Sequence, residues 1–336
     1  MRNLIKVLAF IVLASGVAFV VWLFVFLINH GIILTPEGKN PNMGLTGEIG
    51  DFVGGVVGTA FSFVATLFVI VTLMEQNRQN QRNIFVQSYY EMLNVHADHV
   101  RQMVLHKSNN EMLRGREVFS QLIKYYDTIY DTIDRYVQNI LNGGIQGKPF
   151  EKEQVEYLKD DFCRKSLVMR LTYGYFFYGS EFYRLRNYKD KIEKTIEETI
   201  LSIGRSNQFY TEGNHVLLGH YYRHMFQMIQ YVINTKCINE EERYTYAKQL
   251  RAQMDDDEQL LLYYDAMSDV GDEWLKTEKD ADEIKQIKQL SPLTRFRMIK
   301  NIPASTTIKG IQPEEQFENT IKLFKTKKMG FFEQRK

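Results

Sequence analysis

The sequence predicts an all-α protein in which a two-helix N-terminal transmembrane hairpin is followed by a helical-bundle cytoplasmic domain. Two stretches of 23 residues without a charge, Val7–Asn29 and Phe52–Met74, each match the about 20 residues that cross a bilayer. The rest of the chain is polar, and its apolar residues recur at helical steps of three and four. Alternating apolar and polar runs, which are typical of strands, are hard to find in it.

The first apolar stretch is expected to be an uncleaved anchor over residues 1–34, because its run is longer than that of a signal peptide. Residues 35–50 then form an external loop, and residues 51–75 form the second transmembrane segment. Basic residues lie at the outer ends of both stretches, namely Arg2, Lys6, Arg78 and Arg82. Because positive charge favours the cytoplasmic side, both termini are expected in the cytoplasm of a two-pass inner-membrane protein, with the lipid bilayer as partner.

A candidate membrane-entry site marks the start of the second segment, at Asp51, Gly54 and Gly55. Asp51 is interpreted as an interfacial helix cap, and a proton or ion site is the alternative. Gly54 and Gly58 share one helical face, which permits close packing with another helix.

The cytoplasmic chain is predicted to begin with a helical stalk over residues 76–114, since no proline or glycine interrupts Thr59–Arg114. A helical domain follows over residues 115–300, and a basic C-terminal tail over residues 301–336. Its part from Ile321 to Lys336 is interpreted as frayed and solvated, and contact of its basic and aromatic residues with anionic lipid or nucleic acid is the alternative. Heptad spacing predicts a helix that packs on another helix through Phe119, Leu122, Tyr126, Ile129, Ile133, Tyr136 and Ile140. Further helices are predicted over residues 151–177, 181–202, 215–236, 239–254 and 255–268, with capping boxes at Asn239 and Asp255.

Charge and cysteine usage exclude several classes of partner. The formal net charge of +1 gives no reason to expect a nucleic-acid partner. Cys163 and Cys237 lie far apart in the sequence, in neither metal-ligand nor redox spacing, which is typical of a reducing compartment. We expect no cofactor.

The densest polar cluster is LLGHYYRHMFQMIQYV, which contains the candidate functional residues His220, Tyr221, Arg223 and His224. Two histidines one helical turn apart can bind a metal ion, with a third ligand from another element. No acid follows at the spacing of metalloprotease helices. We therefore expect no metal, and we interpret these residues as groups that form hydrogen bonds between helices.

A second cluster, RAQMDDDEQLLLYYDAMS, adds Arg251, Gln253 and Glu258 to the candidate functional residues. Its four consecutive acids could bind a divalent cation, but helix capping explains the first and the last of them. Arg251 and Glu258 are expected to be ion-pair partners for the His220 helix. Whether these residues line an accessible pocket or a closed core is open at this point.

Arg101 and His106 are the catalytic candidates. They are separated by four residues on the predicted stalk helix, a spacing that resembles the Arg-and-His site of HEPN-type ribonucleases. Such a two-residue pattern also arises by chance in a histidine-containing helix.

Three blocks of the sequence resemble the AbiC-like family of phage abortive infection proteins, which are bacterial membrane proteins. The blocks are GEIGDFVGGVVGTAFSFVATL, GHYYRHMFQMIQYV and RAQMDDDEQLLLYYDAMS. The order of the blocks and the two-span N-terminus also agree with the family, so the resemblance extends over most of Gly47–Ser268. Two positions depart from the family: Asp255 stands where serine is common, and Val57–Thr59 where a proline-containing step is common. Aspartate caps a helix as well as serine does, and the second change predicts a straighter span.

The resemblance implies antiphage defence, in which an infected cell stops growing or dies before phage release. We expect the cytoplasmic helices to sense a phage-derived or host protein or to execute the response, and the protein to form a homo-oligomer. The sequence presents no Gly-rich phosphate loop, nucleophile elbow or CxxC pair, so it does not present an enzyme. The alternatives are a membrane-tethered HEPN-like ribonuclease toxin and a non-catalytic scaffold that binds a partner through its heptad face.

Overall fold

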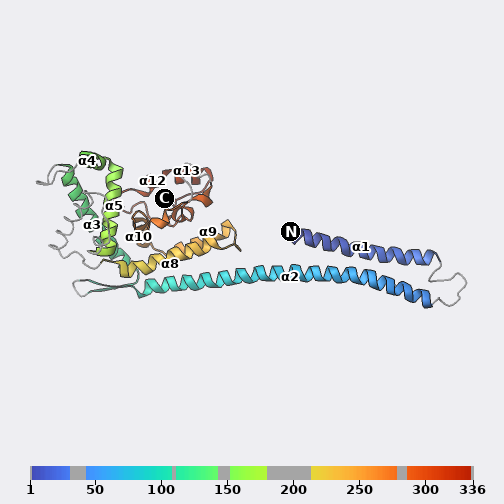
Figure 1. Cartoon of the computed structure of the whole chain (residues 1–336). Coiled ribbons are helices and arrows are strands. Elements are labelled where there is room, and N and C mark those ends of the chain that lie inside the picture. The colour runs from blue at the N-terminus through green and yellow to red at the C-terminus, as the bar shows by residue number, and fades with distance from the viewer. Residues whose placement is uncertain are drawn as a thin grey trace. The chain divides into compact units, whose positions relative to one another are not determined.

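The computed structural model describes residues 2–30, 43–107, 111–142, 152–179, 213–277 and 286–333, and it is mostly helical (Figure 1). The helix predicted over residues 181–202 and most of the loop predicted over residues 35–50 lie outside the described residues. The last part of that loop, from Met43, is helical, because no proline follows Pro41 in it. The chain divides into two units, Met1–Val86 and Gln87–Lys336, and each is described by itself.

The first unit contains α1 (Arg2–Asn29) and the first part of α2 (Met43–Gln102). The two helices meet where Gly16 lies next to the ring of Phe61. Most apolar side chains of this unit are exposed, among them Trp22 and Phe63. Both helices are long and apolar enough to cross a membrane, as judged by length and composition.

A two-stranded antiparallel hairpin follows the end of α2 at Gln102. β1 (Val104–His106) pairs with β2 (Met112–Arg114), and Val104 lies opposite Arg114. The prediction that the stalk stays helical to Arg114 is wrong. The all-α class holds, because this short hairpin is the one sheet in the described part of the chain. Burial of Met103 and Leu105 and the left-handed backbone of Gly115 (φ 59°) favour the hairpin over a continued helix.

α3 (Glu117–Leu141) packs against α5 (Asp161–Tyr178) and confirms the predicted heptad face. Six of the seven predicted positions are buried, namely Phe119, Leu122, Tyr126, Ile129, Ile133 and Ile140. The single helix predicted over residues 151–177 is divided into α4 (Lys152–Lys159) and α5. The division occurs because the Asp160 side chain caps α5 by accepting a hydrogen bond from the N–H of Cys163 (2.8 Å).

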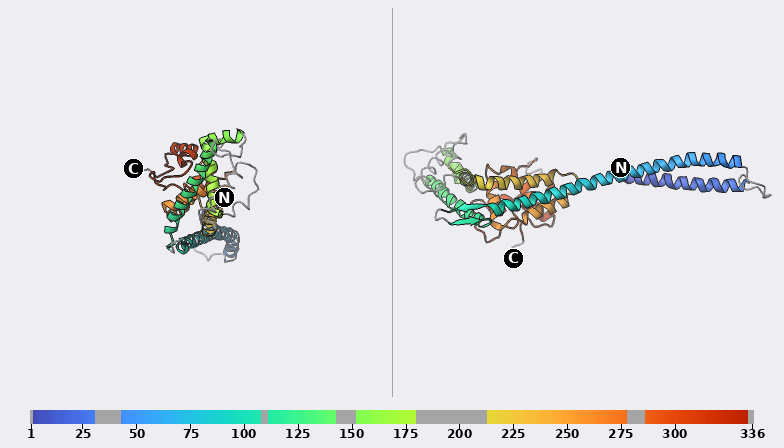
Figure 2. Two further views of the ribbon diagram at one scale, coloured as in Figure 1. Left: turned by 90° about the vertical axis from the view of Figure 1, so that its left-hand side faces the viewer. Right: turned by 90° about the horizontal axis from the view of Figure 1, so that it is seen from below.

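The next three helices confirm the prediction for residues 215–268: α8 (His215–Asn234), α9 (Glu240–Arg251) and α10 (Asp256–Ala266). Both predicted capping boxes form, at Asn239 and at Asp255. α8 and α9 lie along the last part of α2, where Tyr89 donates a hydrogen bond to the carbonyl of Tyr246 (Figures 1 and 2). α10 is buried from Glu258 to Ala266, so it is a core helix without an exposed face there.

Short elements complete the second unit: η2 (Asp272–Trp274), η4 (Ile287–Gln289), α11 (Pro292–Arg295), α12 (Pro313–Gln316) and α13 (Glu318–Thr326). The prediction of a frayed tail is wrong for its described part. Phe324 and Phe331 are buried there, and the ring of Phe331 contacts the rings of Phe324 and Phe317. The aromatic residues between the basic ones therefore form a small core.

Candidate functional site

Three histidines meet where the last turns of α2 contact α8. The ring of His96 stacks on the rings of Tyr221 (4.8 Å between centroids) and His224 (5.9 Å). His99 meets His224 edge to face, with the centroids 5.1 Å apart. Burial, reinforced by the two other histidines, lowers the pKa of His96 to about 3, and burial also lowers the pKa of His224. The His96 ring is therefore neutral at pH 7 and packs as an aromatic group.

This contact differs from the hydrogen bonding predicted for the α8 cluster. His220 is exposed on α8, whereas His224 is half-buried and contacts His96 and His99 of α2. Among the described residues, the Nδ1 atoms of His96, His99 and His224 and the hydroxyl of Tyr221 have no hydrogen-bond partner. In the same part of the chain, no group of three or more His, Cys, Asp or Glu is arranged to hold a metal ion. The helices are joined here by ring packing.

Glu258 is fully buried in the first turn of α10. Its Oε2 accepts a hydrogen bond from the N–H of Asp255 (2.6 Å), whereas its Oε1 has no hydrogen-bond partner among the described residues. Burial, and secondly the charge of Asp255, raises the pKa of Glu258 to about 8. Glu258 is therefore mostly protonated at pH 7, and it caps a helix as a neutral group.

Arg251 does not pair with Glu258 or with the α8 cluster, so the predicted ion pairs are wrong. Its Nη1 donates hydrogen bonds to the carbonyls of Phe296 and Arg297, at 2.9 Å each. These carbonyls follow α11, and a buried guanidinium satisfies the free acceptors of a helix end. Arg251 thus joins α9 to the C-terminal segment.

Gln253 and Arg101 line one pocket of about 320 Å³, together with His96 and Arg116. Arg116 Nη2 donates a hydrogen bond to the backbone carbonyl of Gln253 (2.6 Å). Arg101 has an exposed side chain that pairs with Asp98 (2.9 Å). His106 lies on β1, so the prediction that Arg101 and His106 share a helix is wrong, because α2 ends between them.

Asp265 is a second buried carboxyl group on α10, beside a cavity of about 180 Å³. Tyr222 and Arg223 from α8 and Gly271 and Trp274 from beyond α10 also line this cavity. Burial raises the pKa of Asp265 to about 7, and the Tyr173 hydroxyl partly opposes this shift. A carboxyl group that titrates near neutral pH beside a cavity is typical of functional sites.

Sequence reasoning missed Asp265 and Tyr222, although both lie in the blocks quoted above. The available signal was a lone acid at the end of the apolar run LLLYY, where an acid has to be buried. His96 and His99 could not be matched with His224, because the residues are far apart in the sequence and only the tertiary fold joins them.

The candidate membrane-entry residues Asp51, Gly54 and Gly55 are exposed on α2. The helix begins at Met43, so Asp51 lies inside it, and the prediction that Asp51 caps a helix start is wrong. A Cβ atom at Gly54, Gly55 or Gly58 would meet no described atom within 4 Å. The close packing predicted at these glycines is therefore not made by the described part of the first unit.

Comparison with known families finds a match that falls on the segment that contains the buried groups of α8 and α10. Residues 213–278 match the family model described as "Putative phage abortive infection protein". The resemblance to the phage abortive infection family is confirmed for this segment, which holds two of the three blocks; the block at residues 47–67 lies outside the match. The matched segment, residues 213–278, contains α8, α9, α10 and η2, and with them His224, Glu258 and Asp265. No curated protein and no solved structure matches the chain.

Proposed function

We propose that the protein is a membrane-anchored antiphage defence protein of the bacterial inner membrane that acts by abortive infection. The abortive infection segment, residues 213–278, is in this proposal the part that senses the trigger or executes the response. The family match carries the proposal, because it falls on the helices that hold the buried ionisable groups.

The contact between α2 and α8 supports a mechanism in which the segment acts on the anchor. α2 contains the uncharged stretch Phe52–Met74 and also His96 and His99, which contact Tyr221 and His224. A rearrangement of α8 would therefore change the packing of the helix that leads to the membrane. Arg78 and Arg82 follow the apolar stretch and favour a cytoplasmic location for the second unit.

The trigger in this proposal is a phage-derived or host protein, and the responding form is a homo-oligomer. Burial raises the pKa of Glu258 to about 8 and that of Asp265 to about 7, so a ligand or partner that changed the surroundings of α10 would change the protonation of these groups. The exposed face at Gly54 and Gly58 permits a second helix to approach closely.

Plating efficiency tests the proposal directly. A broad panel of phages is plated on bacteria that carry the gene and on bacteria with a frameshifted copy of it. At least one phage is expected to form many-fold fewer plaques on the first strain. Equal plating across the whole panel, with the protein present in the membrane fraction, would contradict the proposal.

A further inference from the structure

An open pocket of about 580 Å³ lies outside the groups described above, with walls from α9, η4, α11 and α13. Sites for small ligands commonly have volumes of about 300 to 1,000 Å³. Lys288, Lys327 and Met329 are exposed at its margin, so the pocket is open to solvent. Apolar side chains such as Ile287 and Phe296 form part of its lining.

Arg297 lines this pocket and is a buried residue, with 6% of its surface exposed. The guanidinium lies over the rings of Tyr244 (4.4 Å to the centroid) and Phe324 (5.3 Å), and Nη1 donates a hydrogen bond to the carbonyl of Gly330 (2.5 Å). Its Nε has no hydrogen-bond partner among the described residues, and none of their carboxylates lies within ion-pair distance. A buried charge without a counter-ion is costly.

A second buried guanidinium lies next to the first. Arg251 lies over the same Tyr244 ring, 5.9 Å from its centroid. Burial lowers the pKa of Arg297, and the positive charge of Arg251 lowers it further. Arg251 donates to carbonyls, and it too has no carboxylate of the described residues within ion-pair distance. Two adjacent positive charges in a protein interior favour an anion that comes from outside the chain.

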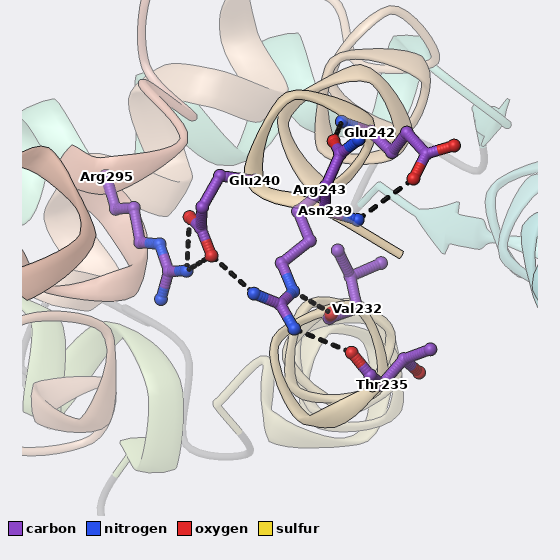
Figure 3. Close-up of polar contacts among 7 residues, drawn as sticks. All are labelled: Val232, Thr235, Asn239, Glu240, Glu242, Arg243 and Arg295. Atoms are coloured by element: carbon purple, nitrogen blue, oxygen red, sulfur yellow. Dashed lines mark hydrogen bonds and ion pairs between the residues drawn. The ribbon is translucent and has the colours of Figure 1, made fainter. Parts of the chain in front are cut away.

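Glu240, one of the two acids in the pocket wall, is already paired with two arginines (Figure 3). It accepts hydrogen bonds from Arg295 Nη2 (2.7 and 2.9 Å) and from Arg243. Arg243 is held in place by the carbonyls of Val232 (3.2 Å) and Thr235 (2.6 Å) at the end of α8. The cations Arg297, Lys288 and Lys327 thus outnumber the one remaining carboxylate in the lining, Glu241.

We propose that this pocket binds a small phosphate ester with a flat or apolar body, the chemical class of the mononucleotides. The exposed ammonium groups of Lys288 and Lys327 bind the phosphate. The buried charges of Arg297 and Arg251 lie behind the pocket wall and favour an anion there without touching it. Ile287, Phe296 and Met329 contact the body of the ligand. The inference rests on this pocket alone and holds whether or not the protein acts against phage.

Isothermal titration calorimetry on the full chain, purified in detergent, tests the proposal. The probes are adenosine and guanosine 5′-monophosphate, with inorganic phosphate and adenosine as separate arms. A nucleotide is expected to bind more tightly than phosphate and more tightly than adenosine. No binding by either nucleotide would overturn the proposal, and so would phosphate binding as tightly as the nucleotides.

Two double variants distinguish binding in the pocket from unspecific binding to positive surface charge. Lys288→Gln with Lys327→Gln removes the exposed cations of the pocket margin, and nucleotide affinity is expected to fall at least tenfold without a change in melting temperature. Lys322→Gln with Lys325→Gln removes two exposed cations of α13 that do not line the pocket, and affinity is expected to stay unchanged. Equal affinity in both double variants would place the ligand elsewhere and overturn the proposal.

Discussion

Gly271 lies directly against the buried carboxyl group of Asp265. A Cβ atom added at Gly271 would overlap the Asp265 carboxyl group and would also approach the Asp265 carbonyl oxygen closely. Both residues belong to the segment that matches the family model, and both line the same cavity. The space around Asp265 therefore depends on the absence of a side chain at position 271.

Gly271→Ala is expected to destabilise the protein by about 2 kcal/mol, because overpacking forces backbone and side chains apart. Gly219→Ala is the matched control, since Gly219 lines the same cavity but its Cβ would meet Phe177 Cζ at an ordinary 3.7 Å. In a helix, alanine is favoured over glycine by about 1 kcal/mol, so this variant should be equally stable or more stable. Urea denaturation of both variants checks the difference, and equal losses would contradict it.

Glu258 is expected to make the protein less stable as the pH rises from about 4.5 through 8. Its pKa rises on folding, from an ordinary 4.5 to about 8, so the folded chain holds the proton that the unfolded chain releases. Stability is then complete below the unfolded pKa and falls through this window. Glu258→Gln keeps an acceptor for the Asp255 N–H but cannot ionise.

The Glu258→Gln variant should match the parent at pH 5 and exceed it at pH 8.5, by on the order of 2 kcal/mol. Melting temperatures across this range, measured for both proteins side by side, check the expectation. A constant offset between the two curves would show that Glu258 is ionised in the folded protein.

His96 is expected to make the protein less stable as the pH falls from about 6.5 toward 3. Its pKa falls on folding from an ordinary 6.5 to about 3, so the unfolded chain binds the proton first. Stability is complete above about pH 6.5 and is lost as the pH falls toward 3. His96→Phe keeps the stacking on Tyr221 but cannot take a proton, so at pH 5 it should be more stable than the parent by about 2 kcal/mol.

Thermal unfolding of the His96→Phe variant at pH 5 and pH 7.5 checks this prediction. The variant and the parent should differ at pH 5 and nearly coincide at pH 7.5. If the advantage is the same at both values, the ring is not buried as a neutral group.

Among the charged residues of α9, substitution of Arg251 is expected to lower the free energy of unfolding most. Arg251→Gln removes hydrogen bonds from a charged group to two carbonyls, with an expected loss of about 2 to 3 kcal/mol. Lys248→Gln on the same helix is the control, because Lys248 is exposed and should change stability by less than about 0.5 kcal/mol. The free energy of unfolding in urea distinguishes the two, and similar values for both would contradict the assignment.

Local chemistry made much of the fold predictable. The capping boxes at Asn239 and Asp255 and the heptad face of α3 follow from residues a few positions apart, and all three form. The hairpin after Gln102 was not predictable, because burial of Met103 and Leu105 depends on neighbours that are distant in the sequence.

The candidate site was predictable only in part, for the same reason. His224, Arg251 and Glu258 are buried or half-buried as expected of functional candidates, but their partners come from other elements. His224 meets His96 and His99 from α2, and Arg251 meets carbonyls that follow α11. A spacing rule within one helix cannot detect such partners.

Infection at low and at high multiplicity tests abortive infection most directly. The phage is one that forms fewer plaques on bacteria that carry the gene. Cultures that carry the gene are expected to survive infection by it at low multiplicity and to collapse at high multiplicity, with few phages released in both cases. Survival of the infected cells at high multiplicity, or a normal burst of phages from them, would contradict the account.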